Sequence, residues 1–148
     1  MIDLLRTTDD FVLMNTLALA LSDIGDERAV EPILERIKDP KTKGYNGTLV
    51  YSLESFDTSP YVDFILELVE EGDYEVRREA YSLLEGMIDK LSKEKKEECL
   101  KRIKTLLADV SDRLDGLKVT FNLFGEAYMP VNDNLITLEK DDEPGLMH

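Results

Sequence analysis

The sequence predicts an all-α protein, a right-handed α-solenoid of about three helix pairs with an irregular C-terminal tail. Two observations carry this prediction. Apolar residues recur three and four positions apart along most of the chain, which is the period of an amphipathic helix. The same apolar pattern returns after 32 residues, which is typical of a repeat protein. We expect residues 1–125 to form the helical repeat domain and residues 126–148 to be an irregular or disordered acidic tail.

The first long helix is predicted over residues 9–22. Thr8 or Asp9 is placed to cap its start, and Gly25 is placed to end it, because glycine accepts the left-handed turn that follows many helices. Its inward face is expected to consist of Leu13, Leu17, Ala18, Leu21 and Ile24.

Asp26 is expected to cap a second helix. Pro32 has no backbone donor, so this helix either kinks at Pro32 or begins its regular part near it. The inward face comprises Ala29, Val30, Ile33, Leu34 and Ile37. Residues 39–47 form a linker, and although Asn46-Gly47 alone would suggest a hairpin turn, the flanks do not alternate as strands do. We therefore expect a loop that leads into a helix.

Four more helices follow this loop. The fourth helix of the chain starts at Ser59-Pro60, the fifth follows Gly72-Asp73, and the sixth opens at Ser92. Their expected inward faces, beginning with the third helix, are Leu49, Val50, Leu53 and Phe56; Tyr61, Val62, Ile65, Leu66 and Val69; Val76, Ala80, Leu83, Leu84 and Met87; and Leu100, Ile103, Leu106, Leu107 and Val110.

The repeat aligns residues 20–24 with residues 52–56, and all five apolar positions of the second helix with those of the fourth, without a gap. A third copy starts at Asp73. Each helix pair exposes an apolar face that only stacking on a neighbouring pair would bury, so the repeat predicts a continuous core and an extended surface.

Two stretches of the chain resemble HEAT repeats, particularly the short type first known from phycobilisome lyases. Residues 20–34 contain Ile-Gly-Asp, then Arg-Ala-Val, then a proline, and residues 73–80 contain Val-Arg followed by alanine, as the family favours. The resemblance covers about residues 4–110 and implies an alpha-alpha superhelix. Met14 and Asn46 stand where the family has the arginine of Val-Arg, so Arg77 is the only clear arginine of this kind.

The sequence contains none of the residue combinations that commonly support catalysis. The sole histidine, His148, is the last residue, which removes Ser-His-Asp, Cys-His and His-based zinc schemes. Cys99 follows two glutamates, whose charge lowers thiol reactivity, and we interpret it as a packing residue. No phosphate loop, dinucleotide fingerprint or calcium loop is present. We therefore expect no enzyme activity, no cofactor and no metal.

The chain has a formal net charge of −14. Nucleic acids and anionic membranes are bound chiefly through basic patches, so this charge argues against both and favours a basic protein partner. The alternative is that the acidity serves only solubility. A lone cysteine, no signal sequence and no apolar run of 18 residues indicate a cytoplasmic setting without a membrane span.

An acidic strip is predicted on the second helices of consecutive repeats. Glu31 and Glu35 align with Asp63 and Glu67, and Glu71 follows one turn later. In such stacks the second helices usually line the concave face, where a partner would bind. The alternative is an ordinary solvated helix face.

Phe64 and Leu68 are two large apolar residues on a nominally polar side of the same helix. They predict a hydrophobic contact with a partner, unless the loop at residues 39–46 or the tail at residues 129–138 covers them.

The sequence thus predicts a non-enzymatic scaffold or adaptor that binds a basic protein through an acidic concave face. A narrower hypothesis is an immunity protein that neutralises a basic toxin. The alternative, implied by the resemblance, is a lyase-like or accessory enzyme of the HEAT-like family. We expect a monomer or a weak homo-oligomer, the latter through the basic surface of residues 93–104.

Overall fold

A computed structural model describes residues 1–109 and 123–124, the side chains of 106–109 excepted. All regular structure in this part of the chain is helical, as predicted. The chain divides into two compact units, Met1–Met87 and Ile88–His148. In order, the α-helices are α1 (Ile2–Thr7), α2 (Phe11–Ile24), α3 (Val30–Lys38), α4 (Gly47–Ser52), α5 (Val62–Glu71), α6 (Tyr74–Met87) and α7 (Lys93–Asp109). Short 3-10 turns lie at Glu27–Ala29, Pro40–Thr42, Leu53–Ser55, Ser59–Tyr61 and Ile88–Lys90.

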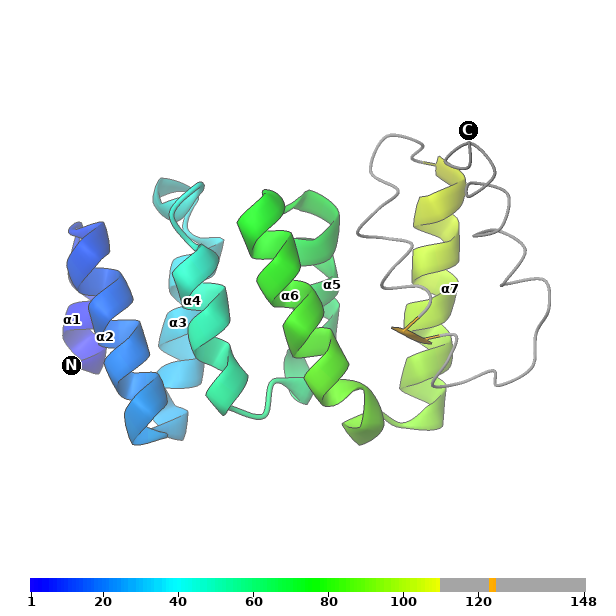
Figure 1. Ribbon diagram of the computed structural model, residues 1–148, viewed down its shortest axis with the longest axis horizontal. Helices are drawn as coiled ribbons and strands as arrows, with labels where there is room; N and C mark the ends of the chain where they lie inside the picture. Colours follow the sequence, from blue (N-terminus) through cyan, green and yellow to red (C-terminus); the bar gives the residue numbers. More distant parts are fainter. Residues whose placement is uncertain (110–122, 125–148) are drawn as a thin grey trace, which may run out of the picture. The chain divides into compact units, whose positions relative to one another are not determined.

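The first unit has two layers of helices (Figure 1). In one layer α4 packs between α2 and α6. In the other layer α1 packs against α3, and α5 lies behind α6 and packs closely on it. Consecutive helices therefore alternate between the layers, which is what the short connections and the one-sided apolar faces of the helices require.

The predicted core is largely confirmed in the first unit. The inward faces assigned to the second, third and fifth helices are buried at every position, because their period matches the helical turn. Three positions differ elsewhere. Leu13 and Tyr61 are only half-buried, and Ile24 is 66% exposed because it lies on the last turn of α2, beside Gly25.

The ends of α2 show how local chemistry sets a boundary. The side chain of Asp10, not Thr8 or Asp9, accepts hydrogen bonds from the backbone N–H groups of Val12 and Leu13, at 2.9 and 3.1 Å. The predicted cap is thus wrong by one or two residues, because α2 starts at residue 11. Gly25 ends the helix with φ of 71°, as predicted.

Pro32 does not break α3. A 3-10 turn capped by Asp26 absorbs the start of the segment, and α3 then begins at Val30, so that Pro32 falls in the first turn, where a backbone donor is not needed. Asn46-Gly47 leads into α4 and not into a hairpin, as predicted. Asp73 caps α6 by accepting a hydrogen bond from the Val76 N–H group at 3.0 Å.

In the second unit, Ser92 caps α7 by accepting a hydrogen bond from the Lys95 N–H group at 3.1 Å. Cys99, Leu100 and Ile103 are buried, so the cysteine is a packing residue there. The predicted inward positions 106, 107 and 110, the boundary at residue 125 and the tail at residues 126–148 lie outside the described side chains. Over the described residues, the structure contains no helix of the length and apolarity that a membrane span needs.

Candidate binding site

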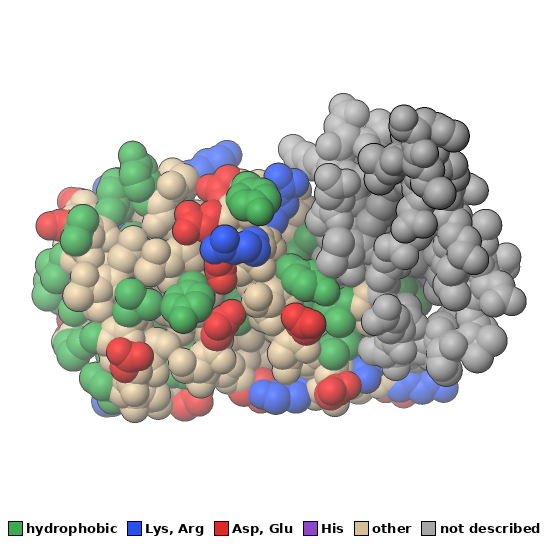
Figure 2. Space-filling model, in the orientation of Figure 1, with side chains coloured by type: hydrophobic (Ala, Val, Ile, Leu, Met, Phe, Trp, Pro, Cys, Tyr) green, Lys and Arg blue, Asp and Glu red, His purple; other side chains and the backbone are tan. Residues whose placement is uncertain are grey.

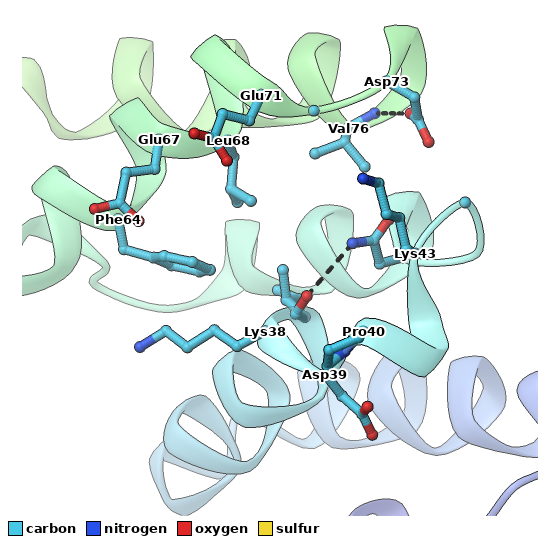
Figure 3. A pocket seen from close by; sticks show the side chains of 14 residues that line it. Lys38, Asp39, Pro40, Lys43, Phe64, Glu67, Leu68, Glu71, Asp73 and Val76 are labelled. Atoms are coloured by element: carbon cyan, nitrogen blue, oxygen red, sulfur yellow. Dashed lines mark hydrogen bonds between the residues drawn. The ribbon is translucent and has the colours of Figure 1, made fainter.

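A pocket of about 450 Å³ opens within the first unit, between the C-terminal end of α3 and the outer side of α5. Three segments form its walls: the end of α3 with the following loop, the exposed side of α5, and the turn from α5 into α6 (Figure 3). The lining residues are Ile37, Lys38, Asp39, Pro40, Lys43, Gly44, Asn46, Phe64, Glu67, Leu68, Glu71, Gly72, Asp73 and Val76.

The apolar part of the pocket comes from Phe64 and Leu68, which are half-buried, and from buried Val76. In Figure 3 the side chains of Phe64 and Leu68 point from α5 toward Lys38 and Pro40. The Lys38 ammonium lies 4.6 Å from the centre of the Phe64 ring, which is a cation–π distance. The loop at residues 39–46 therefore flanks these two side chains without closing over them. The predicted cover by residues 129–138 lies outside the described residues.

The charge of the pocket is mixed but mainly acidic. Its lining carries four carboxylates, of Asp39, Glu67, Glu71 and Asp73, against the two ammonium groups of Lys38 and Lys43. The Asp39 carboxylate is already paired with Arg36 at 3.2 Å. Glu67 and Glu71 are exposed, and over the described part of the chain neither has an ion pair. These two carboxylates are consequently available to a cation.

Glu31 and Glu35 lie outside the pocket, and their carboxylates form hydrogen bonds with other side chains of the chain. The Arg6 side chain donates to both carboxylate oxygens of Glu35, at 2.9 and 3.4 Å, which ties α1 to α3. This hydrogen bond holds the pKa of Glu35 below its usual range and raises that of Arg6. The hydroxyl of Tyr61 donates to Glu31 at 2.7 Å, and this bond raises the pKa of Tyr61.

The predicted site residues therefore divide into two groups. Four of the seven, Phe64, Glu67, Leu68 and Glu71, lie together in the lining of the pocket. Glu31 and Glu35 make internal contacts, and Asp63 is exposed outside the pocket lining. The aligned positions have different neighbours: Arg6 binds Glu35, whereas its equivalent Lys38 lies over the Phe64 ring and leaves Glu67 without an ion pair from the described residues.

The wall opposite α5 is formed by Lys38, Pro40, Lys43 and Asn46, none of which was among the predicted site residues. The sequence had suggested the loop at residues 39–46 only as a cover for Phe64 and Leu68, and the structure places residues of this loop in the lining beside them. The opposite layer is not a second acidic surface, because Figure 2 shows hydrophobic, acidic and basic side chains mixed over α2, α4 and α6. Tyr51 and Tyr74 are among the exposed apolar residues of that layer.

The groove before the pocket, between α1 and α3, is filled by Arg36. This residue is only 7% exposed. Its guanidinium donates to the backbone oxygen of Thr8 at 2.8 Å, to the sulfur of Met14 at 3.3 Å and to the Asp39 carboxylate at 3.2 Å. The Arg6 backbone oxygen lies at 3.5 Å. One buried arginine thus joins α3 to the segment that connects α1 and α2.

Comparisons with protein-family models, with curated proteins and with solved structures find no match to this chain. Within the described residues there is also no group of three histidine, cysteine, aspartate or glutamate side chains arranged to hold a metal ion.

Proposed function

We propose that the protein is a non-enzymatic binding module, built as a HEAT-like right-handed α-solenoid, that holds a basic protein against the α3–α5 pocket. The repeat of 32 residues supports this architecture, as does the alternation of successive helices between two layers. The observation that carries the binding role is the pocket itself. It brings the apolar side chains of Phe64 and Leu68 together with the carboxylates of Glu67 and Glu71.

This combination suits a protein ligand. Apolar side chains supply the area that desolvation needs, and carboxylates at the margin select a positively charged partner and speed its approach. The net charge of −14 acts in the same direction over a longer range. In the narrower form of the proposal, the protein is a cytoplasmic immunity protein and its partner is a basic toxin.

The experiment that tests the proposal is a pull-down from a native lysate with the wild type and the variant Glu67→Lys/Glu71→Lys. A matched control, Glu54→Lys/Glu85→Lys, makes the same change in net charge on exposed residues outside the pocket lining. We expect a basic protein to be retained by the wild type and the control and lost by the pocket variant, with all three giving the same circular dichroism spectrum.

A partner that both variants retain would remove the pocket from the proposal. Equal loss from both variants would mean that only the overall charge matters. The immunity hypothesis adds a requirement of its own, because the captured protein must be toxic to cells and the wild type must suppress that toxicity. If the captured protein is not toxic, the proposed binding function is retained and the immunity hypothesis is rejected.

A further inference from the structure

The groove between α1 and α3 and the pocket between α3 and α5 are related by the repeat. Thirty-two residues separate equivalent positions. In the first groove Arg36 fills the space between the helices. Its equivalent in the pocket is Leu68, which is shorter and carries no charge. Arg36 is thus buried between α3 and the α1–α2 connection, whereas Leu68 lines an open pocket at the equivalent position.

The groups that bind the Arg36 guanidinium also have equivalents. The acceptors are Arg6 and Thr8, through their backbone oxygens, and Met14 and Asp39, through their side chains. Their equivalents thirty-two residues later are, in the same order, Lys38, Pro40, Asn46 and Glu71, and all four line the pocket. These four residues surround the pocket, but Leu68 supplies no donor in place of Arg36. The Pro40 oxygen also accepts from the Lys43 N–H group at 3.3 Å, and the Asn46 amide donates to the Ile37 oxygen at 3.5 Å, which leaves the Asn46 side-chain oxygen as the acceptor toward the pocket.

The ion pair between α1 and α3 also has no counterpart in the next repeat. Arg6 pairs with Glu35 across the first groove at 2.9 Å, and the equivalent residues are Lys38 and Glu67. Lys38 does not pair with Glu67 but lies over the Phe64 ring at 4.6 Å. Glu67 is thereby left beside the pocket with its charge uncompensated by an ion pair from the described residues.

We propose that the α3–α5 pocket binds an arginine side chain supplied by the partner protein, in the place that Arg36 occupies in the preceding groove. The Glu71 carboxylate takes the part of Asp39, and the Asn46 side-chain oxygen that of the Met14 sulfur. The backbone oxygens of Lys38 and Pro40 complete the set, and flanking apolar residues of the partner pack on Phe64. This inference rests on the proposed function and names the chemistry that the pocket recognises.

Guanidinium suits the site better than an anion or a lysine would. Carboxylates outnumber ammonium groups in the lining, so an anion would be repelled. A planar guanidinium carries five donors and reaches several oxygens at once, whereas an ammonium is a point charge. Residues 126–148 contain no arginine, so this segment cannot supply the side chain that we propose for the pocket.

The first test uses a defined probe, the capped peptide Ala-Leu-Arg-Leu-Ala, with a control peptide in which citrulline replaces arginine. Citrulline has nearly the same shape and no charge. Binding to the full-length protein is followed through the backbone amide resonances. We expect saturable shifts at residues 38–46 and 64–76, and binding of the citrulline peptide at least about tenfold weaker, since a hydrogen bond to a charged group contributes about 1.5–3 kcal/mol and 1.4 kcal/mol is tenfold.

The second test restores the missing arginine from within. In Leu68→Arg the new side chain would fill the pocket as Arg36 fills its own groove. We expect a higher melting temperature and binding of the arginine peptide weakened at least about tenfold, with Leu68→Met as the control that keeps binding. Should Leu68→Arg fail to fold, Glu71→Gln decides instead. It must weaken the arginine peptide and leave the citrulline peptide unchanged, while Glu54→Gln changes neither.

Each result has a defined meaning. Equal binding of the two peptides, or shifts confined to α2 and α4, overturns the inference, and so does a Leu68→Arg variant that still binds. A dimer of the full-length protein that Leu68→Arg abolishes would make a second copy the occupant in place of a foreign partner. If arginine is not preferred but Glu67→Lys/Glu71→Lys still loses a protein partner, the inference fails and the proposed function stands.

Discussion

Replacing Arg36 with methionine tests how much one buried guanidinium stabilises the first unit. The side chain of Arg36 is 9% exposed, and methionine keeps most of its packing volume while removing every polar contact. The bond to the Thr8 oxygen at 2.8 Å is short and charge-assisted, which corresponds to about 1.5–3 kcal/mol. The pair with Asp39, whose side chain is 27% exposed, adds about 0–1 kcal/mol. We therefore expect the free energy of unfolding to fall by about 1.5–4 kcal/mol.

The assay is urea unfolding followed by circular dichroism. With a slope of about 2 kcal/mol per molar urea, the midpoint of Arg36→Met should fall by about 1–2 M. The matched control is Arg28→Met, because Arg28 also forms an ion pair, with Asp26 at 2.8 Å, but its side chain is 82% exposed. Exposed pairs contribute little to stability, so the midpoint of the control should shift by less than about 0.5 M urea. Equal shifts in the two variants would refute the view that burial makes Arg36 important.

Three further predictions concern local contacts. The hydrogen bond to Glu31 raises the pKa of Tyr61, so this bond stabilises the folded protein below the ordinary pKa of tyrosine, and the stabilisation is lost as the pH rises through the raised pKa of Tyr61. In Glu31→Gln, phenolate absorbance should show that Tyr61 ionises at lower pH than in the wild type. An unchanged titration would contradict this prediction. Gly25→Ala should destabilise by about 1 kcal/mol, because φ is 71°, whereas Gly86→Ala in α6 should stabilise by about 0.5 kcal/mol; the same sign for both in thermal unfolding would refute the argument. Asp10→Ala should cost about 1 kcal/mol in urea unfolding and Asp10→Asn much less, since asparagine also caps; equal losses would exclude capping.

The helices of the first unit were predictable because their signals are local. A stripe such as Ile33, Leu34 and Ile37 recurs with the helical period, and burying it needs no knowledge of the partner helix. Boundaries were less secure. Asp9 and Asp10 are equally good caps by residue type, and the backbone at the start of α2 decided between them.

Four of the fourteen residues that line the pocket, Phe64, Glu67, Leu68 and Glu71, were predicted from the sequence. Phe64 and Leu68 stood out because they break the polar pattern on one side of their helix. They were predicted to make a hydrophobic contact with a partner unless the loop at residues 39–46 or the tail covered them. The structure places both half-buried in the pocket lining, whereas Pro32 and Arg36 on the equivalent side of α3 are buried. Nothing in the sequence said that α1 covers this side of α3 whereas the loop after α3 only flanks the corresponding side of α5.

The helical class, the 32-residue repeat, most of the core positions of the first unit and the acidic charge follow from residue type and from spacing along the chain. Which carboxylates form ion pairs or hydrogen bonds, and where a pocket opens, depends on the packing of the helices. Those properties depend on pairs far apart in sequence, such as Arg6 with Glu35 and Arg36 with Thr8. Arg36 is buried against the segment that connects α1 and α2, whereas Leu68, at the equivalent position of the next repeat, lines an open pocket.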